Sequence, residues 1–96
     1  MYDSKIKNPE TDALFRAVLS LKNEEDCYRF FEDICTIKEI RDIAQRLEVA
    51  RMLKSGDTVA SIAQRTGAST TTVSRVNRCL QYGTGGYALV LDNSQK

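Results

Sequence analysis

The sequence predicts an all-α fold, a small helical domain that carries a helix-turn-helix. Apolar residues recur at spacings of three and four through most of the 96 residues, which is the period of helices with one buried face. The longest such segment runs from Thr36 to Lys54 between clear start and stop signals. Two shorter segments of the same period meet at Gly67, so we expect two short helices joined by a sharp turn.

The helix-turn-helix is predicted over residues 58–82. Its apolar positions are Val59, Ile62 and Ala63 before Gly67, and Val73, Val76 and Leu80 after it. Ala63 lies four residues before Gly67, where two tightly crossing helices leave no room for a larger side chain. Gly67 can take the positive φ that such a turn requires. Each helix therefore has one buried face and one face turned outward.

The outward positions of the second helix carry hydroxyl and guanidinium groups, which donate hydrogen bonds. Ser69 or Thr70 is expected to cap this helix. No carboxylate occurs from Thr58 to Leu91, as expected of a surface that approaches phosphates. The candidate DNA-binding residues are Thr58, Ser61, Ser69, Thr70, Thr71, Thr72, Ser74, Arg75 and Arg78.

Helix pairs of this kind also occur as plain packing units, so a protein-interaction module that keeps the fold without binding DNA is the alternative function. A protein-binding helix would gain nothing from excluding Asp and Glu over so long a stretch. The missing carboxylates therefore favour DNA.

The length of the chain fits a single domain. The charge is distributed unevenly along it. Residues 1–57 hold ten Lys and Arg against twelve Asp and Glu, a net charge of −2, whereas residues 58–96 hold four against one, a net charge of +3. The basic part carries the helix-turn-helix. The excess is small, so affinity for DNA would need two copies of the surface or specific base contacts. A chain this short also buries a modest core, which favours a homodimer.

The cysteines and the N-terminus exclude several functions. Cys27, Cys35 and Cys79 have no C-x-x-C spacing and the chain has no His, so we expect reduced packing residues, no metal site and no enzyme. The N-terminus is polar and no apolar run is long enough for a membrane span. We therefore expect a cytoplasmic protein without a membrane partner.

The N-terminal third is predicted to form dimerisation helices. Residues 1–8 should be a mobile arm, Asn8 and Pro9 should start a helix that reaches about Leu21, and Asn23 should cap a second helix ending near residue 35. The apolar residues of these helices are Leu14, Phe15, Val18, Leu19, Leu21, Cys27, Tyr28, Phe30, Phe31 and Ile34. This is more apolar surface than one small neighbour covers, so a partner subunit is its expected destination.

A central core helix is predicted over residues 36–55, opened by a capping box of Thr36 and Glu39 and stopped by Ser55 and Gly56. Its apolar stripe comprises Ile37, Ile40, Ile43, Leu47, Ala50 and Leu53, widened by Ala44, Val49 and Met52. After a glycine-rich turn at residues 83–86, residues 87–92 form an apolar plug. Period alone does not separate strand from helix there, and we expect a short helix followed by disorder from Asp92 to Lys96.

The order of these elements resembles the Trp repressor superfamily, and within it the small Trp repressor-related proteins of the YerC/YecD type. The specific part is Thr36 to Leu80, a capped central helix followed directly by the helix-turn-helix, and the segment from Tyr82 to Tyr87 looks like a signature of that branch. The resemblance implies an all-helical homodimer in which the N-terminal helices of two chains interlock.

The resemblance also implies a possible effector pocket. Trp repressor holds its corepressor with a threonine at the start of the central helix, an arginine within that helix and an arginine on the recognition helix, matched here by Thr36, Arg46 and Arg75. A glycine that leaves room for the ligand is matched by Val76, and a serine that holds its amino group by Cys79. A small-molecule corepressor stays open, but these two changes predict that tryptophan does not bind.

The function predicted from the sequence is a sequence-specific DNA-binding transcriptional regulator, with repression favoured, that acts on double-stranded DNA as a homodimer. The second helix of the motif would read base edges, with Thr58 and Ser61 near the backbone.

Overall fold

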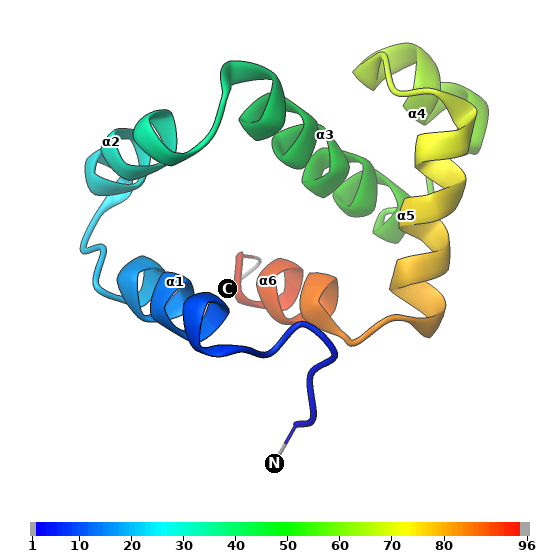
Figure 1. Cartoon of the computed structure of the whole chain (residues 1–96). Helices are drawn as coiled ribbons and strands as arrows, with labels where there is room; N and C mark the ends of the chain where they lie inside the picture. Colours follow the sequence, from blue (N-terminus) through cyan, green and yellow to red (C-terminus); the bar gives the residue numbers. More distant parts are fainter. Residues whose placement is uncertain (1, 95–96) are drawn as a thin grey trace. The chain divides into compact units, whose positions relative to one another are not determined.

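The computed structural model describes residues 2–94 and is all-helical, with six helices and no strand in that range. The helices are α1 (Pro9–Leu19), α2 (Glu24–Ile34), α3 (Ile37–Lys54), α4 (Val59–Thr66), α5 (Thr70–Tyr82) and α6 (Gly86–Ser94), labelled in Figure 1. The chain divides into two compact units, residues 1–37 and 38–96. The all-α prediction is confirmed.

The first unit contains α1 and α2, and both begin at the predicted caps. Asn8 Oδ1 accepts a hydrogen bond from the Thr11 N–H at 2.7 Å, and Asn23 Oδ1 accepts one from the Asp26 N–H at 2.8 Å. α1 ends two residues before the predicted Leu21. The Leu21 N–H bonds back three residues to the Val18 carbonyl at 3.1 Å, so the last turn tightens and the helix ends.

Neither helix of the first unit buries a side chain, taking the chain as residues 2–94 describe it. Phe15 is 50% exposed and Leu19 is 84% exposed. Phe30 and Phe31 contact each other edge to face, with ring centroids 5.3 Å apart. The apolar faces predicted for these helices are therefore present and only partly covered, with Val18, Leu21, Phe30 and Phe31 half-buried. The mobility predicted for residues 1–8 stays a prediction; Lys7 in that arm forms an ion pair with Asp12 at 2.7 Å.

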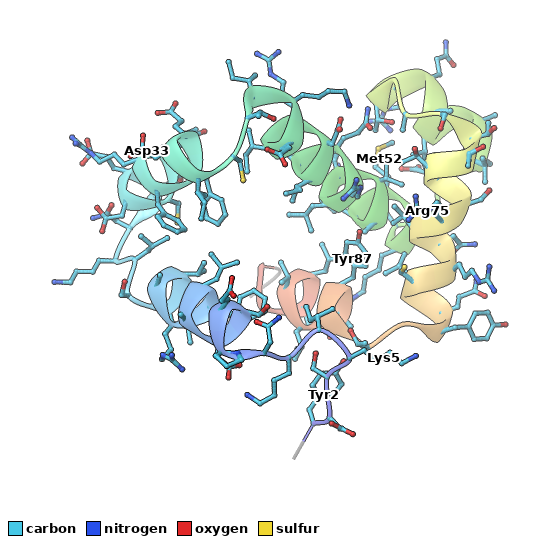
Figure 2. The ribbon with its side chains drawn as sticks, in the orientation of Figure 1. Tyr2, Lys5, Asp33, Met52, Arg75 and Tyr87 are labelled. Carbon is cyan, nitrogen blue, oxygen red and sulfur yellow. The ribbon has the colours of Figure 1, made fainter. Side chains whose placement is uncertain are left out.

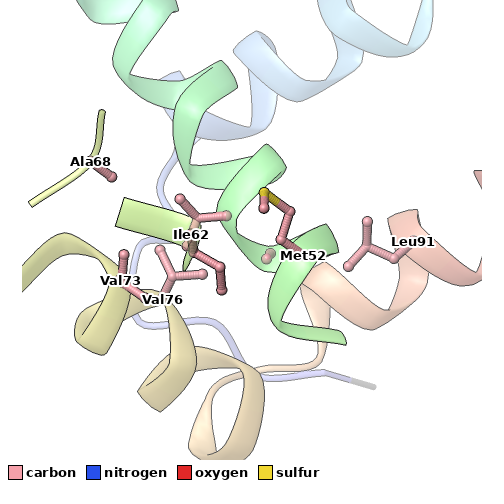
Figure 3. Packing of buried hydrophobic residues seen from close by; sticks show 8 residues of the cluster. Met52, Ile62, Ala68, Val73, Val76 and Leu91 are labelled. Carbon is pink, nitrogen blue, oxygen red and sulfur yellow. The ribbon is translucent and has the colours of Figure 1, made fainter. Parts of the chain in front are cut away.

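The second unit has its own hydrophobic core. Its buried residues come from α3, α4, α5, α6 and the turn after α4, as Figure 3 shows: Val49, Ala50, Met52, Ile62, Ala68, Val73, Val76 and Leu91. Leu53, Leu80 and Tyr87 pack against this cluster while staying partly exposed. The core thus fixes the two helices of the predicted motif against the C-terminal half of α3.

The apolar stripe predicted for α3 enters the core of the single chain only in the second half of the helix. Its buried residues all lie in its second half, whereas Ile37 is 69% exposed and Ile43 is 48% exposed. The reason is that the core cluster of the second unit takes its α3 members from Val49, Ala50 and Met52 alone. The predicted end of α3 is confirmed, since Gly56 has a φ of +90° and its neighbour Asp57 donates to the Met52 carbonyl at 3.1 Å, a pattern typical of glycine-ended helices.

The C-terminal plug is a helix, as preferred from the sequence. The disorder predicted from Asp92 is wrong for residues 92–94, because α6 continues to Ser94. Leu91 is buried and Asp92 forms an ion pair with Lys54 at the end of α3. Both contacts attach this end of α6 to the rest of the second unit. Residues 95 and 96 of that prediction lie outside the described residues. No helix between residues 2 and 94 is both long and apolar enough to cross a membrane.

Candidate nucleic-acid interface

The turn between α4 and α5 is built as the sequence predicts. Gly67 is left-handed, with a φ of +75°, and its N–H donates to the Ala63 carbonyl at 2.9 Å. A β-carbon would lower the stability of this conformation in most residues, which explains the glycine. In Figure 1, α4 and α5 lie at a steep angle on either side of this turn.

Two further side chains hold the turn, and sequence reasoning missed both. The Thr66 hydroxyl donates to the Ile62 carbonyl at 2.7 Å and accepts from the Ala68 N–H at 3.1 Å. Gln45 of α3 donates through Nε2 to the Thr66 carbonyl at 3.2 Å. Because these polar groups are partly buried, their hydrogen bonds keep the turn from opening. A threonine just before the turn glycine was a local signal, whereas Gln45 lies 21 residues away and gave none.

Two of the predicted DNA-binding hydroxyls, those of Thr58 and Ser69, act as helix caps. Thr58 Oγ1 accepts from the Ser61 N–H at 3.1 Å at the start of α4. Ser69 Oγ accepts from the Thr72 N–H at 3.0 Å, and the Ser69 hydroxyl donates to Thr72 Oγ1 at 3.0 Å. Ser69, and not Thr70, is therefore the cap of α5. The Thr58 and Ser69 side chains fix where α4 and α5 begin. At the start of each of these helices, the free backbone N–H groups carry a partial positive charge.

One residue of the predicted set, Ser61, lies on α4 and is partly buried. Five others lie on one exposed face of α5, opposite the buried Val73 and Val76. They are Thr70, Thr71, Ser74, Arg75 and Arg78. Neither Arg75 nor Arg78 forms an ion pair within residues 2–94. We call this set, together with Ser69, the α5 polar face. It presents hydrogen-bond donors and two uncompensated positive charges to solvent.

Beside the polar face, a cleft of about 300 Å³ opens between α3, α5 and α6. Its lining residues are Arg46, Thr72, Arg75, Val76, Cys79 and Tyr87. The structure thus brings together three of the four predicted effector residues, Arg46, Arg75 and Cys79. The fourth, Thr36, belongs to the first unit and is not among the residues that line the cleft.

Tyr87 is a lining residue that sequence reasoning placed only in the apolar plug. It extends from α6 and is partly buried, and it is labelled with Arg75 in Figure 2. Burial raises the pKa of the Tyr87 phenol above its ordinary value; proximity to Cys79 adds to the increase and the Arg46 charge opposes it. The phenol is therefore neutral at physiological pH and contributes an aromatic surface to the cleft.

The cysteines and acidic residues provide no metal site among the described residues. The packing role predicted for the cysteines is wrong for Cys27 and Cys79, which are both exposed, while Cys35 is partly buried. Cys27 lies on α2, which buries no side chain in the described chain, and Cys79 opens onto the cleft. All three thiols are free.

Comparison with known proteins agrees with this geometry. A family model described as Trp repressor protein matches residues 9–95. A protein of Bacillus subtilis (strain 168) named YerC, itself uncharacterized, is 56% identical over 92 residues, which is 96% of this chain and 88% of that protein.

Two solved structures also match over nearly the whole chain. A candidate Trp repressor from Staphylococcus aureus is 49% identical with a TM-score of 0.91, covering 95% of this chain and 91% of the other. A TrpR-like protein from Eubacterium eligens ATCC 27750 is 49% identical with a TM-score of 0.92, covering 97% and 96%.

Proposed function

We propose that this chain, which belongs to the Trp repressor family, is a sequence-specific DNA-binding transcriptional regulator, most simply a repressor, that acts in the cytoplasm as a homodimer. The family has a regulator fold and is not a family of enzymes. The observation that carries the proposal is the α5 polar face, where two arginines without an acidic partner stand among hydroxyl donors. A stretch without carboxylates from residue 58 to 91 surrounds it.

In this proposal α5 is the recognition helix and enters the major groove with its N-terminal half. Thr71 and Arg75 lie one turn apart on the exposed face, so both can reach base edges. An arginine reads guanine through two parallel hydrogen bonds to O6 and N7. Thr58 and Ser61, at the start of α4, would lie near the phosphates, where the helix N-terminus favours an anion.

The exposed apolar faces of α1 and α2 support the homodimer. Phe15 and Leu19 are large, exposed and on one helix, and a second copy of the same helices is the simplest self-complementary cover for them. A two-fold dimer would present two α5 helices to DNA. The target is then a roughly two-fold-symmetric site with half-sites about one helical turn apart, roughly 34 Å.

The first experiment is selection of bound duplexes from a randomised pool, followed by binding curves for the selected duplex and a scrambled one at physiological salt. We expect the selected duplex to bind far more tightly. Arg75→Ala should weaken that binding by about 1–3 kcal/mol, roughly 5-fold to 150-fold, because base contacts of a bidentate arginine are lost.

The matched control is Arg29→Ala, which removes an exposed arginine of α2 that lies 3.6 Å from Glu25. It should leave the affinity within about twofold, since an exposed pair of this kind contributes little. Identical curves for the selected and scrambled duplexes would contradict the proposal and favour a protein-interaction module.

We also propose that tryptophan is not an effector of this protein. Val76 is 4% exposed and belongs to the hydrophobic core while it lines the cleft, so its side chain cannot move aside without disturbing that core. Cys79, a weak hydrogen-bond donor and acceptor, would hold an ammonium group poorly. Calorimetry with millimolar L-tryptophan should show no binding heat. A micromolar isotherm would contradict this, whereas another small corepressor bound near Arg46 and Arg75 would not.

A further inference from the structure

We propose that Tyr87 is a positioning residue for DNA recognition: its ring braces the cleft between α3 and α5, so that α6 holds the recognition helix in place. The inference deepens the proposed function, on which it rests. The lining of the cleft includes Arg46 of α3, Arg75 of α5 and one aromatic side chain of α6, that of Tyr87.

The cleft and the α5 polar face share a residue. Arg75 lines the cleft and also lies on the exposed face that we assign to DNA. Anything that changes the cleft wall therefore changes the surroundings of Arg75. Val76 and Cys79, which are also on α5, line the same cleft. The cleft wall therefore extends along the middle of the recognition helix.

α5 is held from two sides within the second unit. It packs against α4 through the helix-turn-helix and against α6 through the C-terminal segment. Tyr87 contacts the hydrophobic core at the first turn of α6. The cluster in Figure 3 shows Leu91 of α6 on the opposite side of Met52 from Ile62, so α6 closes the core at that end.

The position of Tyr87 is fixed because α6 is attached at both ends. At its far end, Leu91 is buried and Asp92 pairs with Lys54 at the end of α3. At its near end, the link from α5 passes through Gly83, where a β-carbon would lie 2.4 Å from the Cys79 carbonyl oxygen. The backbone there follows α5 closely, and Gly85 then turns the chain with a φ of +86°.

A ring held in this way pre-organises the recognition helix. The cleft is as small as the smallest ligand pockets, and its aromatic wall belongs to the chain itself. If α5 lost the brace, only a fraction of molecules would hold the DNA-competent arrangement, and the apparent affinity for DNA would fall in proportion to that fraction.

The test compares Tyr87→Ala with Tyr82→Ala, which removes an 81% exposed tyrosine near the end of α5. Tyr87→Ala should weaken binding of the selected duplex about tenfold or more, as expected if roughly a tenth of the molecules stay competent. Tyr82→Ala should leave it unchanged. Millimolar p-cresol, which has the shape of the missing side chain, should restore binding by Tyr87→Ala and leave the unmodified protein unaffected.

A second variant and a second readout separate the brace from simple loss of folding. Tyr87→Phe keeps the ring and should bind DNA as the unmodified protein does. Amide hydrogen exchange in α5 should accelerate about tenfold in Tyr87→Ala and slow again with p-cresol. This readout needs no DNA, so it decides the brace even if the protein recognises no specific sequence.

Two results would overturn the inference. One is unchanged DNA affinity and α5 exchange in Tyr87→Ala. The other is a loss that p-cresol does not reverse while Tyr87→Phe is also impaired, since the phenol hydroxyl or general folding would then be the cause.

Discussion

The second unit of the chain buries eight hydrophobic side chains among α3 to α6, whereas α1 and α2 of the first unit bury none in the part of the chain that the structure describes. Yet both helices of the first unit begin at regular asparagine caps and carry apolar faces. The difference indicates that the second unit is stabilised by its own core. The first unit consists of well-formed helices whose large apolar side chains stay largely exposed.

The two units are therefore suited to different tasks. A unit with a closed core can hold α5 rigidly and present a fixed polar face. A unit with open apolar faces is suited to association, because burying large apolar side chains is the main favourable term in subunit contacts. The exposed first half of α3, with Ile37 and Ile43, belongs with the open surfaces although α3 also enters the core.

The largest effect is expected from charging the open surface. Phe15 is half exposed in the single chain, so Phe15→Glu would cost a monomer little. In a dimer it should cost about 3 kcal/mol or more, because a phenylalanine leaves the contact and a carboxylate has to be desolvated there. Sedimentation equilibrium should show at least a roughly 100-fold weaker association.

The control is Lys22→Glu, which introduces a carboxylate at an exposed position between α1 and α2 and changes the charge by −2, against −1 for Phe15→Glu. It should leave association nearly unchanged. Equal behaviour of the two variants would mean that Phe15 is not at a subunit contact.

A smaller effect is expected at the turn of the second unit. A β-carbon at Gly67 meets no atom within 4 Å, so Gly67→Ala strains only the backbone, which has a φ of +75°. The cost should be about 1–2 kcal/mol. Thermal unfolding at fixed chain concentration should show a lower Tm, with partial recovery in Gly67→Asn, since asparagine tolerates this conformation better.

Gly86→Ala is the matched control, since its β-carbon would lie 3.9 Å from Thr84 Oγ1 and its φ is not positive. Its Tm should be unchanged or slightly higher. A Tm for Gly67→Ala equal to that of the unmodified protein would contradict the left-handed turn.

The smallest effect is expected for Gln45→Ala, which removes the hydrogen bond from α3 to the Thr66 carbonyl. The loss should be about 1 kcal/mol, measured by urea unfolding, because a partly buried carbonyl loses its side-chain donor. Gln81→Ala removes a longer, exposed hydrogen bond to Asn77 and should have almost no effect. Equal losses would show that Gln45 does not anchor the turn.

Local features of this fold could be predicted from the sequence. The caps at Asn8 and Asn23, the α5 cap expected at Ser69 or Thr70 and found at Ser69, and the left-handed Gly67 each depend on a few neighbouring residues. The exposed donors of α5 followed from helical periodicity alone. These predictions need only the spacing of residues along one helix.

Features that join distant segments could not be predicted. Periodicity showed that α3 has an apolar stripe, but not that the core of its own chain covers only the second half. Gln45 reaches Thr66, and Tyr87 reaches the cleft between Arg46 and Arg75, through contacts between separate helices. A sequence pattern identifies which face is apolar, and the packing of elements decides what covers it.

The central claim is that two chains associate through the first unit so that two copies of α5 meet one DNA site. The most direct measurement is light scattering on the protein at micromolar concentration, alone and with one equivalent of the selected duplex per two chains. We expect twice the chain mass of 10.8 kDa for the free protein, and two chains on each duplex in the complex. A folded monomer that binds the duplex one chain at a time would contradict it.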